Sequence, residues 1–181
     1  MEESQIIQLA QEGNPIYKEL LFVNNYDMVF SYLIKLTLDR PLAEDLCQET
    51  MVKGLMNLHK FKGESKFSTW LITIATNLFR NHYKKNKNRQ EKEHLINIDL
   101  DFFSHDFDHN LFTRDLLREV LAYLRTLKPN QSLPFILKHY HGYDMKTIAK
   151  IMKCPLGTVK SRIHQTIGKV KEQFKEVEYE L

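Results

Sequence analysis

Glycine and proline are scarce in this chain of 181 residues, which contains 6 glycines and 5 prolines. No stretch alternates apolar and polar residues over the length of a β-strand, and few residues are available for the tight turns that join strands. These two absences argue against a sheet protein. We therefore expect an all-α fold.

Cysteine is equally rare. Cys47 and Cys154 lie far apart and belong to no CxxC pair, which argues against a disulfide framework and predicts single thiols in a reducing cytoplasm. The 8 histidines show neither an HExxH motif nor another paired-ligand spacing. We therefore predict no metal site and no cofactor.

Long apolar runs are also missing. No segment approaches the roughly 18 uninterrupted apolar residues of a membrane span, and no signal-like apolar core follows the acidic residues 1–5. We expect a cytoplasmic chain that is not inserted in a membrane. Apolar residues still make up 43% of the sequence, which is enough for a buried core and argues against wholesale disorder.

Positive charge is in small excess overall, but its distribution is uneven. The chain has 26 Lys and Arg against 23 Asp and Glu, for a formal net charge of +3. Between residues 146 and 175, eight basic residues accompany a single acid, Glu172. Clustered basic charge of this kind is typical of a surface that binds a polyanion.

The C-terminal part has the pattern of a helix-turn-helix. Asp144 is placed to cap a short helix over residues 145–152, and Lys153 and Cys154 form a turn into a longer helix that begins near Pro155. The longer helix has one apolar face, formed by Val159, Ile163, Ile167, Val170 and Phe174. In this motif the second helix enters the major groove of duplex DNA.

Polar and basic side chains near this motif are the candidate DNA contacts, because such side chains reach phosphates and base edges. They are Lys146 in the short helix and Thr158, Lys160, Ser161, Arg162, His164, Gln165 and Lys169 in the longer one. Of these, we expect Thr158, Arg162, Gln165 and Lys169 to lie directly opposite the apolar face. A solvated basic face in an ordinary helical pair is the alternative.

Four further helices are predicted in the N-terminal half, over about residues 4–11, 15–38, 42–58 and 69–85. In the third helix Asp45, Gln48 and Glu49 share a polar side. Its apolar side is predicted to carry Leu42, Leu46, Met51, Leu55 and Met56. In the fourth helix Trp70 has apolar companions, so we expect it to be a core residue and not a stacking platform for a base.

Residues 93–110 differ from both halves, because they are acidic and aromatic and show no helical period. We predict two small helical domains, residues 1–92 and 111–181, joined by this segment as a linker. The linker is too apolar to be a simple tether, so we expect it to dock on another surface. A short strand or helix packed on its own chain is an alternative with nearly equal support.

Three separated motifs resemble the extracytoplasmic-function (ECF) group of bacterial sigma factors. Residues 157–162 (Gly-Thr-Val-Lys-Ser-Arg) are similar to the start of that group's helix that reads the −35 promoter element. Residues 43–49 (Ala-Glu-Asp-Leu-Cys-Gln-Glu) resemble its helix that binds core polymerase, and residues 61–83 resemble its segment that reads the −10 element. The motifs span both halves in the expected order.

The resemblance implies a subunit that binds core RNA polymerase and directs it to promoters, with no catalysis and no small-molecule substrate of its own. Its first domain would read and open the −10 element, and its second would bind the −35 element as duplex. It also implies a dedicated anti-sigma factor as a partner, although no residue here identifies one. The acids of the linker (Asp99, Asp101, Asp106 and Asp108) suggest nucleic-acid mimicry in the RNA-exit path of the polymerase, a hypothesis from charge alone.

The resemblance also assigns roles to individual residues. Asp45, Gln48 and Glu49 would contact the clamp-helix coiled coil of the largest polymerase subunit. Asn77 would lie beside a pocket for a −10 base turned out of the stack. The loop before it, with Lys62, Lys66 and Phe67, would help to enclose that base. The contacts to the backbone of the opened strand or the adjacent duplex would be Arg80, Asn81, Lys84 and Lys85.

Two rival functions stay open from the sequence. A conventional helix-turn-helix regulator would use the N-terminal helices for dimerisation or ligand binding, but it would not need the polar face with Asn77, Arg80 and Lys84. An inhibitor of the polymerase would not need the basic recognition helix.

Overall fold

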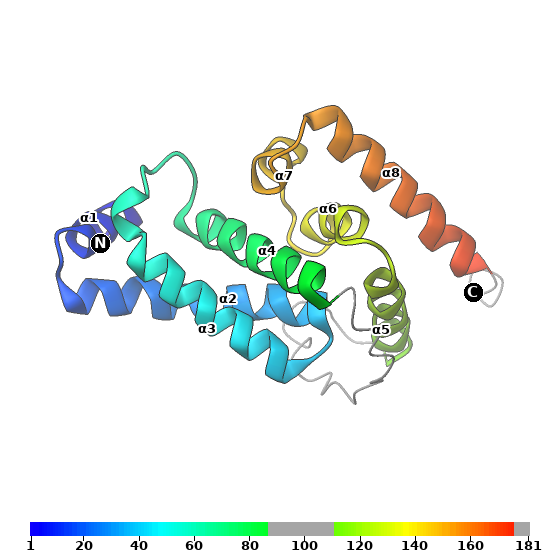
Figure 1. Cartoon of the computed structure of the whole chain (residues 1–181), viewed down its shortest axis with the longest axis horizontal. Coiled ribbons are helices and arrows are strands. Elements are labelled where there is room, and N and C mark those ends of the chain that lie inside the picture. Colours follow the sequence, from blue (N-terminus) through cyan, green and yellow to red (C-terminus); the bar gives the residue numbers. More distant parts are fainter. Residues whose placement is uncertain (87–110, 176–181) are drawn as a thin grey trace. The chain divides into compact units, whose positions relative to one another are not determined.

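The computed structural model describes residues 1–86 and 111–175, and every regular element within these two ranges is helical (Figure 1). The elements are α1 (Glu3–Gln11), α2 (Pro15–Thr37), α3 (Arg40–Met56), the 3₁₀ turn η1 (Leu58–Lys60), α4 (Phe67–Asn86), α5 (Leu111–Thr126), α6 (Pro129–His139), α7 (Met145–Met152) and α8 (Leu156–Gln173). The prediction of an all-α fold is confirmed.

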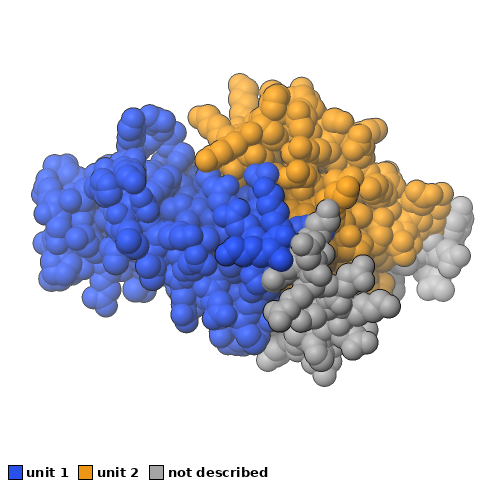
Figure 2. Space-filling model, viewed as in Figure 1, with its two compact units in different colours: residues 1–34, 39–95 blue, residues 35–38, 96–181 orange. Residues whose placement is uncertain are grey.

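The chain divides into two compact units (Figure 2). The first comprises Met1–Ile34 and Asp39–Leu95, and the second comprises Lys35–Leu38 and Ile96–Leu181. The predicted linker, residues 93–110, lies outside the described residues together with its four acids. Across the part of the chain that the structure describes, no helix combines the length and apolarity needed to cross a bilayer.

The helices of the first unit begin where the sequence supplies caps. Asn14 precedes α2 and accepts a hydrogen bond from the Ile16 amide (3.1 Å). Asp39 caps α3 through the Leu42 amide (3.0 Å), and a proline occupies the first turn of that helix. These side chains satisfy amides that have no partner within the helix, and the proline lacks the amide that would need one.

The core of the first unit is closed around a glycine of α3. A Cβ at Gly54 would lie 2.8 Å from Leu71 Cδ2 of α4 and 2.8 Å from Phe22 Cε1 of α2. On α2 and α4 the large side chains of Leu33, Phe67 and Leu71 are fully buried. Three helices therefore approach one another closely because Gly54 has no side chain.

The second unit buries leucine and isoleucine side chains from α5 to α8. The largest that are fully buried include Leu121, Leu124, Leu133, Leu137, Ile148 and Ile151. Thr166 of α8 is also buried, and its hydroxyl donates to the Gln131 carbonyl of α6 (3.1 Å). This hydrogen bond fixes the rotation of α8 against the unit, which decides the side chains that α8 presents to solvent.

Candidate nucleic-acid interface

A pocket of about 340 Å³ opens beside α4 in the first unit. Its lining comes from the end of α3, from η1 and from α4: Lys53, Asn57, Lys60, Trp70, Ile74, Asn77, Leu78 and Asn81. Three amides and two ammonium groups therefore border an apolar floor, and no acid belongs to the lining. The volume falls in the range of small-ligand sites, roughly 300–1,000 Å³.

Asn77 is half-buried in this pocket, and its side-chain amide forms no hydrogen bond within residues 1–86 and 111–175. An asparagine amide offers two donor hydrogens and an acceptor oxygen, which is the pattern that pairs with a base edge. The neighbouring Thr76 is buried and bonded to Tyr32 of α2 (2.7 Å). The orientation of α4 is thereby set, and the Asn77 amide is left available to a ligand.

Trp70 is both a packing residue and a wall of the pocket. Its ring centroid lies 5.4 Å from that of Phe61 and 5.5 Å from that of Phe67. The residue is half-buried and also lines the pocket. Trp70 therefore packs against Phe61 and Phe67 as expected of a core residue, but it also lines the pocket.

Phe67 requires a correction. We predicted that it would enclose a base, but its exposed fraction is 0%. Its ring makes edge contacts with Phe22 and Phe61, both with centroids 5.4 Å away. As the first residue of α4 it lies on the buried side of that helix, so its role is to pack the core behind the pocket.

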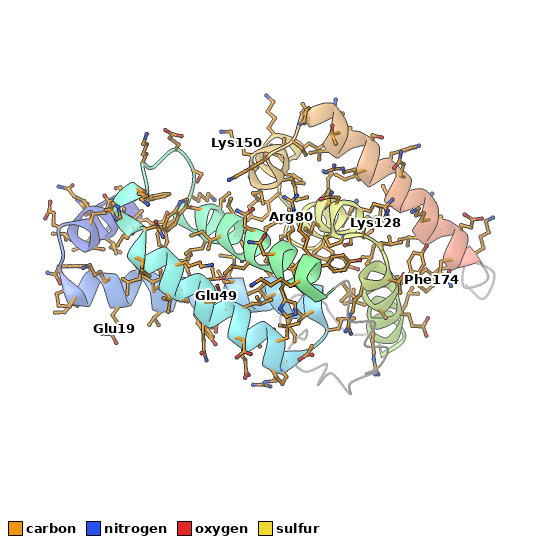
Figure 3. The ribbon with its side chains drawn as sticks, in the orientation of Figure 1. Glu19, Glu49, Arg80, Lys128, Lys150 and Phe174 are labelled. Carbon is orange, nitrogen blue, oxygen red and sulfur yellow. The ribbon has the colours of Figure 1, made fainter. Side chains whose placement is uncertain are left out.

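The other predicted −10 residues lie at different depths. Lys62 and Lys66 are exposed in the loop before α4 and do not line the pocket. Arg80 (labelled in Figure 3) is half-buried. Along the same helix Asn81, Lys84 and Lys85 are exposed, and Asn81 belongs to the lining. The end of α4 thus carries basic charge away from the pocket.

Three polar residues of the lining were missed from the sequence: Lys53, Asn57 and Lys60. Lys53 and Asn57 fall inside the predicted helix over residues 42–58, and Lys60 follows it, so none of these positions was singled out. A signal was present, because Lys53 and Asn57 are spaced i,i+4 and so share a helical face. The sequence alone does not predict that this face lies beside α4.

The predicted polymerase contacts form one exposed face of α3. Asp45, Gln48 and Glu49 are all exposed, and Figure 3 labels Glu49 on this helix. Glu49 forms an ion pair with Lys53 (2.8 Å), with both side chains about half exposed. Such a pair contributes little, about 0–1 kcal/mol, so Glu49 stays available to another protein.

The apolar side predicted for α3 is wrong at two positions. Leu55 is 48% exposed and Met56 is 70% exposed, whereas the buried side is formed by Ala43, Leu46, Cys47, Thr50 and Gly54. Small residues occupy the buried side because α3 packs closely on its neighbours. Val52 is also exposed, at 56%. Val52, Leu55 and Met56 form an apolar patch beside the exposed face that contains Asp45 and Glu49.

The second unit contains the predicted helix-turn-helix, with α7 at the expected residues. Asp144 Oδ1 accepts from the amides of Lys146 (2.8 Å) and Thr147 (3.0 Å), and Oδ2 accepts from the Thr147 hydroxyl (2.6 Å). These hydrogen bonds hold the pKa of the Asp144 carboxyl below its usual value, with the Thr147 hydroxyl as the largest cause. Lys153 then adopts a left-handed backbone (φ 50°, ψ 51°) that ends α7 and turns the chain toward α8.

The solvent face of α8 differs from the predicted one. Lys160, Ser161, His164 and Gln165 are exposed, as is Lys146 in α7. Thr158, Arg162 and Lys169 are half-buried and lie at the edge of this face, not opposite the core. The reason is that Thr166 is fully buried with Val159, which turns the buried stripe toward Thr158 and Arg162. Arg162 Nη1 lies 3.8 Å from Cys154 Sγ in the turn.

Neither cysteine is bonded to another. Cys47 is buried on α3, and desolvation raises the pKa of its thiol to about 12. Cys154 is half-buried. Within the two described ranges, no group of His, Cys, Asp and Glu side chains is arranged to hold a metal ion.

These features define a class: a helical DNA-binding protein of two units, with a helix-turn-helix in the second and a polar pocket in the first. Residues 21–89 match the sigma-70 region 2 family, and residues 117–170 match the sigma-70 region 4 family. The first match covers the pocket between α3, η1 and α4, and the second covers the helix-turn-helix.

Curated relatives agree over nearly the whole chain. RNA polymerase sigma factor YlaC of Bacillus subtilis is 30% identical over 157 residues, which is 86% of this chain and 91% of the relative. RNA polymerase sigma-H factor of Pseudomonas aeruginosa is 28% identical over 170 residues (90% and 88%), and the ECF sigma-E factor of Haemophilus influenzae is 28% identical over 169 residues (89% and 89%). The chain belongs to the ECF sigma factors of bacterial RNA polymerase.

Two solved structures share the fold. One is the sigma factor RpoE in complex with the anti-sigma factor NepR from Bartonella quintana, with a TM-score of 0.64 and 22% identity over 87% of this chain and 96% of that one. The other is CnrH in complex with the cytosolic domain of CnrY, with a TM-score of 0.66 and 17% identity over 94% and 96%. A sigma factor is a subunit of the polymerase, so the conventional regulator acting alone is not favoured.

Proposed function

We propose that this sigma factor captures a base of the −10 promoter element in the pocket beside Asn77. The observation that carries the proposal is the half-buried Asn77 amide, which faces the pocket with no hydrogen bond among the described residues. Turning a base out of the stack costs a few kcal/mol, so the pocket must offer compensating contacts. The amides supply edge hydrogen bonds, and Trp70 and Ile74 supply apolar contact.

Basic residues outside the pocket lining, before and after Asn77 in the chain, suit the backbone of the opened strand. Arg80, Lys84 and Lys85 follow Asn77 along α4, and Lys62 and Lys66 lie exposed in the loop before it. Their charges attract phosphates whatever the base sequence. We therefore assign base recognition to the pocket and strand retention to these five residues.

The −35 element is proposed to lie against α8. The exposed Ser161, His164 and Gln165 are placed for base edges in the major groove, and Lys160 accompanies them. Arg162, Thr158 and Lys169 lie at the edge of that face, where phosphates pass, and Lys146 starts the helix that crosses the backbone. Phosphate contacts of this kind fix the position of the protein along the duplex, but they do not determine which base sequence it prefers.

Core polymerase is proposed to bind the exposed face of α3. Acidic groups on Asp45 and Glu49 attract basic residues across an interface, and the exposed Val52 and Met56 add apolar area beside them. In this proposal the polymerase performs the chemistry, so the chain itself is not an enzyme. The chain would act in the cytoplasm. We propose that the domain that binds core polymerase and the −10 element comprises residues 1–92, and that the domain that binds the −35 element comprises residues 111–181.

A protein inhibitor is proposed as a further partner. Both of the solved structures described above are complexes with a second protein: the sigma factor RpoE is bound to the anti-sigma factor NepR, and CnrH is bound to the cytosolic domain of CnrY. We propose that this chain is held in the same general way. Affinity capture of the tagged chain, followed by an assay of whether the captured protein blocks transcription, tests this point.

Transcription in vitro tests the main proposal. Core RNA polymerase should produce promoter-specific transcripts only when the chain is added. Asn77→Ala should lower open-complex formation at least tenfold while leaving core binding unchanged, and Asn24→Ala, an exposed asparagine on α2, should behave as the wild type. Binding to duplex DNA with two-fold half-sites and without polymerase would instead support the conventional regulator.

A further inference from the structure

Gln11 of α1 bonds to both ends of the turn η1. Its Nε2 donates to the carbonyl of Leu58 (2.9 Å) and to the carbonyl of Phe61 (2.8 Å), which lie 47 and 50 residues away in the chain. An amide nitrogen carries two hydrogens, so both are used on η1. The first helix therefore fixes the turn that borders the pocket.

Asn57 and Lys60 are joined on the pocket side of this turn. Asn57 Nδ2 donates to the Lys53 carbonyl (2.8 Å), which fixes the orientation of its amide. Asn57 Oδ1 then accepts from Lys60 Nζ (2.9 Å). Both side chains line the pocket, so the Lys60 ammonium is held at its rim.

The partner of Lys60 differs from that of the other lysine in the lining. Lys53 is paired with the carboxylate of Glu49 at 2.8 Å. Lys60 is held by the neutral amide of Asn57, and within residues 1–86 and 111–175 it forms no ion pair. Among the described residues no carboxylate therefore neutralises the Lys60 ammonium, and the lining of the pocket contains no acid.

We propose that Lys60 contacts the phosphate of the nucleotide whose base enters the pocket, and that Asn57 and Gln11 are positioning residues for Lys60. A compact ammonium group suits a phosphate as a point charge. Because the two amides hold it before DNA arrives, less side-chain freedom is lost on binding. This inference rests on the proposed capture of a −10 base.

Salt dependence of binding tests the contact. The probe is a fluorescent single strand that carries the −10 element of a promoter transcribed by the wild-type holoenzyme. Loss of one phosphate contact to a single strand should lower the slope of log affinity against log salt by about 0.7. Lys60→Met should show this change with a five- to tenfold loss of affinity at low salt, and Lys128→Met in the second unit should show neither.

The positioning roles of Asn57 and Gln11 are tested by whether the effects of their substitutions depend on Lys60. Asn57→Asp should weaken binding more than Asn57→Ala, because a carboxylate neutralises the ammonium. Gln11→Ala should weaken single-strand binding three- to tenfold, whereas Gln8→Ala, which removes only an exposed bond to Glu12 (3.0 Å), should not. In the Lys60→Met background, Gln11→Ala should have no further effect.

Three outcomes would overturn parts of this picture. If Lys60→Met keeps the salt slope of the wild type while Asn77→Ala abolishes strand binding, the phosphate contact is wrong and the base pocket stands. If Gln11→Ala also lowers core and −35 duplex binding to the same extent, Gln11 supports the fold in general and is no positioning residue. If the wild-type holoenzyme does not bind the strand, the base pocket itself is wrong.

Discussion

The hydroxyl groups of Tyr32 and Thr76 lie 2.7 Å apart, and both residues have an exposed fraction of 0%. Thr76 Oγ1 also donates to the Ile72 carbonyl (2.7 Å), so Tyr32 supplies the proton of the bond between the two hydroxyls. This bond joins α2 to α4 one residue before Asn77. It ties the rotation of α4, and with it the direction of the Asn77 amide, to the core.

Tyr32→Phe should therefore affect both stability and promoter opening. Loss of a buried hydrogen bond of this type lowers the free energy of unfolding by about 1 kcal/mol. Denaturant unfolding measures this loss, and permanganate footprinting of the −10 region should show reduced opening. Tyr17→Phe, a half-buried tyrosine on the same helix, should change stability by less than about 0.5 kcal/mol. Equal effects of the two changes would contradict the role of the bond.

Replacement of Gly54 should destabilise the first unit although it raises helix propensity. Gly54→Ala gains about 1 kcal/mol of propensity. The new Cβ would meet Leu71 and Phe22 at 2.8 Å, and such overpacking typically costs about 1–3 kcal/mol. We expect a lower midpoint in thermal unfolding. Gly168→Ala on α8, where nothing lies within 4 Å of the new Cβ, should raise the midpoint instead.

The apolar patch on α3 predicts a specific loss of polymerase affinity. Met56→Glu should weaken core binding about tenfold in a competition assay, because a charge would enter the apolar part of the interface. The fold should be unaffected, since Met56 is 70% exposed. Ile16→Glu on α2, at the same exposure, is the matched control and should bind core polymerase as the wild type does. Equal losses in both variants would show that the patch has no special role.

Acidification should weaken the helix-turn-helix through Asp144. The folded-state pKa of this carboxyl lies below 3.8, so its stabilising effect is complete above that value and is lost as pH falls through the lowered pKa. Asp144→Asn should lower the thermal midpoint of the second unit at pH 7, and the gap to wild type should close in the acid range. Glu172→Gln, which removes an exposed carboxylate of α8 that caps no helix, is the control for the loss of one negative charge.

Helix positions followed from the sequence where local chemistry decides them. The cap at Asp144 predicted α7 at Met145–Met152, and α2 begins at Pro15 as predicted, directly after Asn14, which accepts from the Ile16 amide. Three separated motifs were also sufficient to identify the family. These features are local, because a cap or a motif needs only its immediate neighbours in the chain.

Helix rotation did not follow from the sequence, and neither did the pocket. Met56 and Phe67 were misplaced because the burial of each is decided by neighbouring helices, here through the close approach at Gly54. On α8 the burial of Thr166 moved Arg162 to the edge of the solvent face. The lining of the pocket combines side chains from α3, η1 and α4, and periodicity within a single helix carries no such information.

The way η1 is anchored has a consequence for the engineering of affinity for the opened strand. Gln11 holds this turn through the carbonyls of Leu58 and Phe61, and a carbonyl is the same whatever side chain its residue bears. The side chains of Asn57 and Lys60 can therefore be exchanged without loss of the anchor. A small library at these two positions, with Gln11 retained, should change how tightly the opened strand is held while the base contacts at Asn77 stay in place.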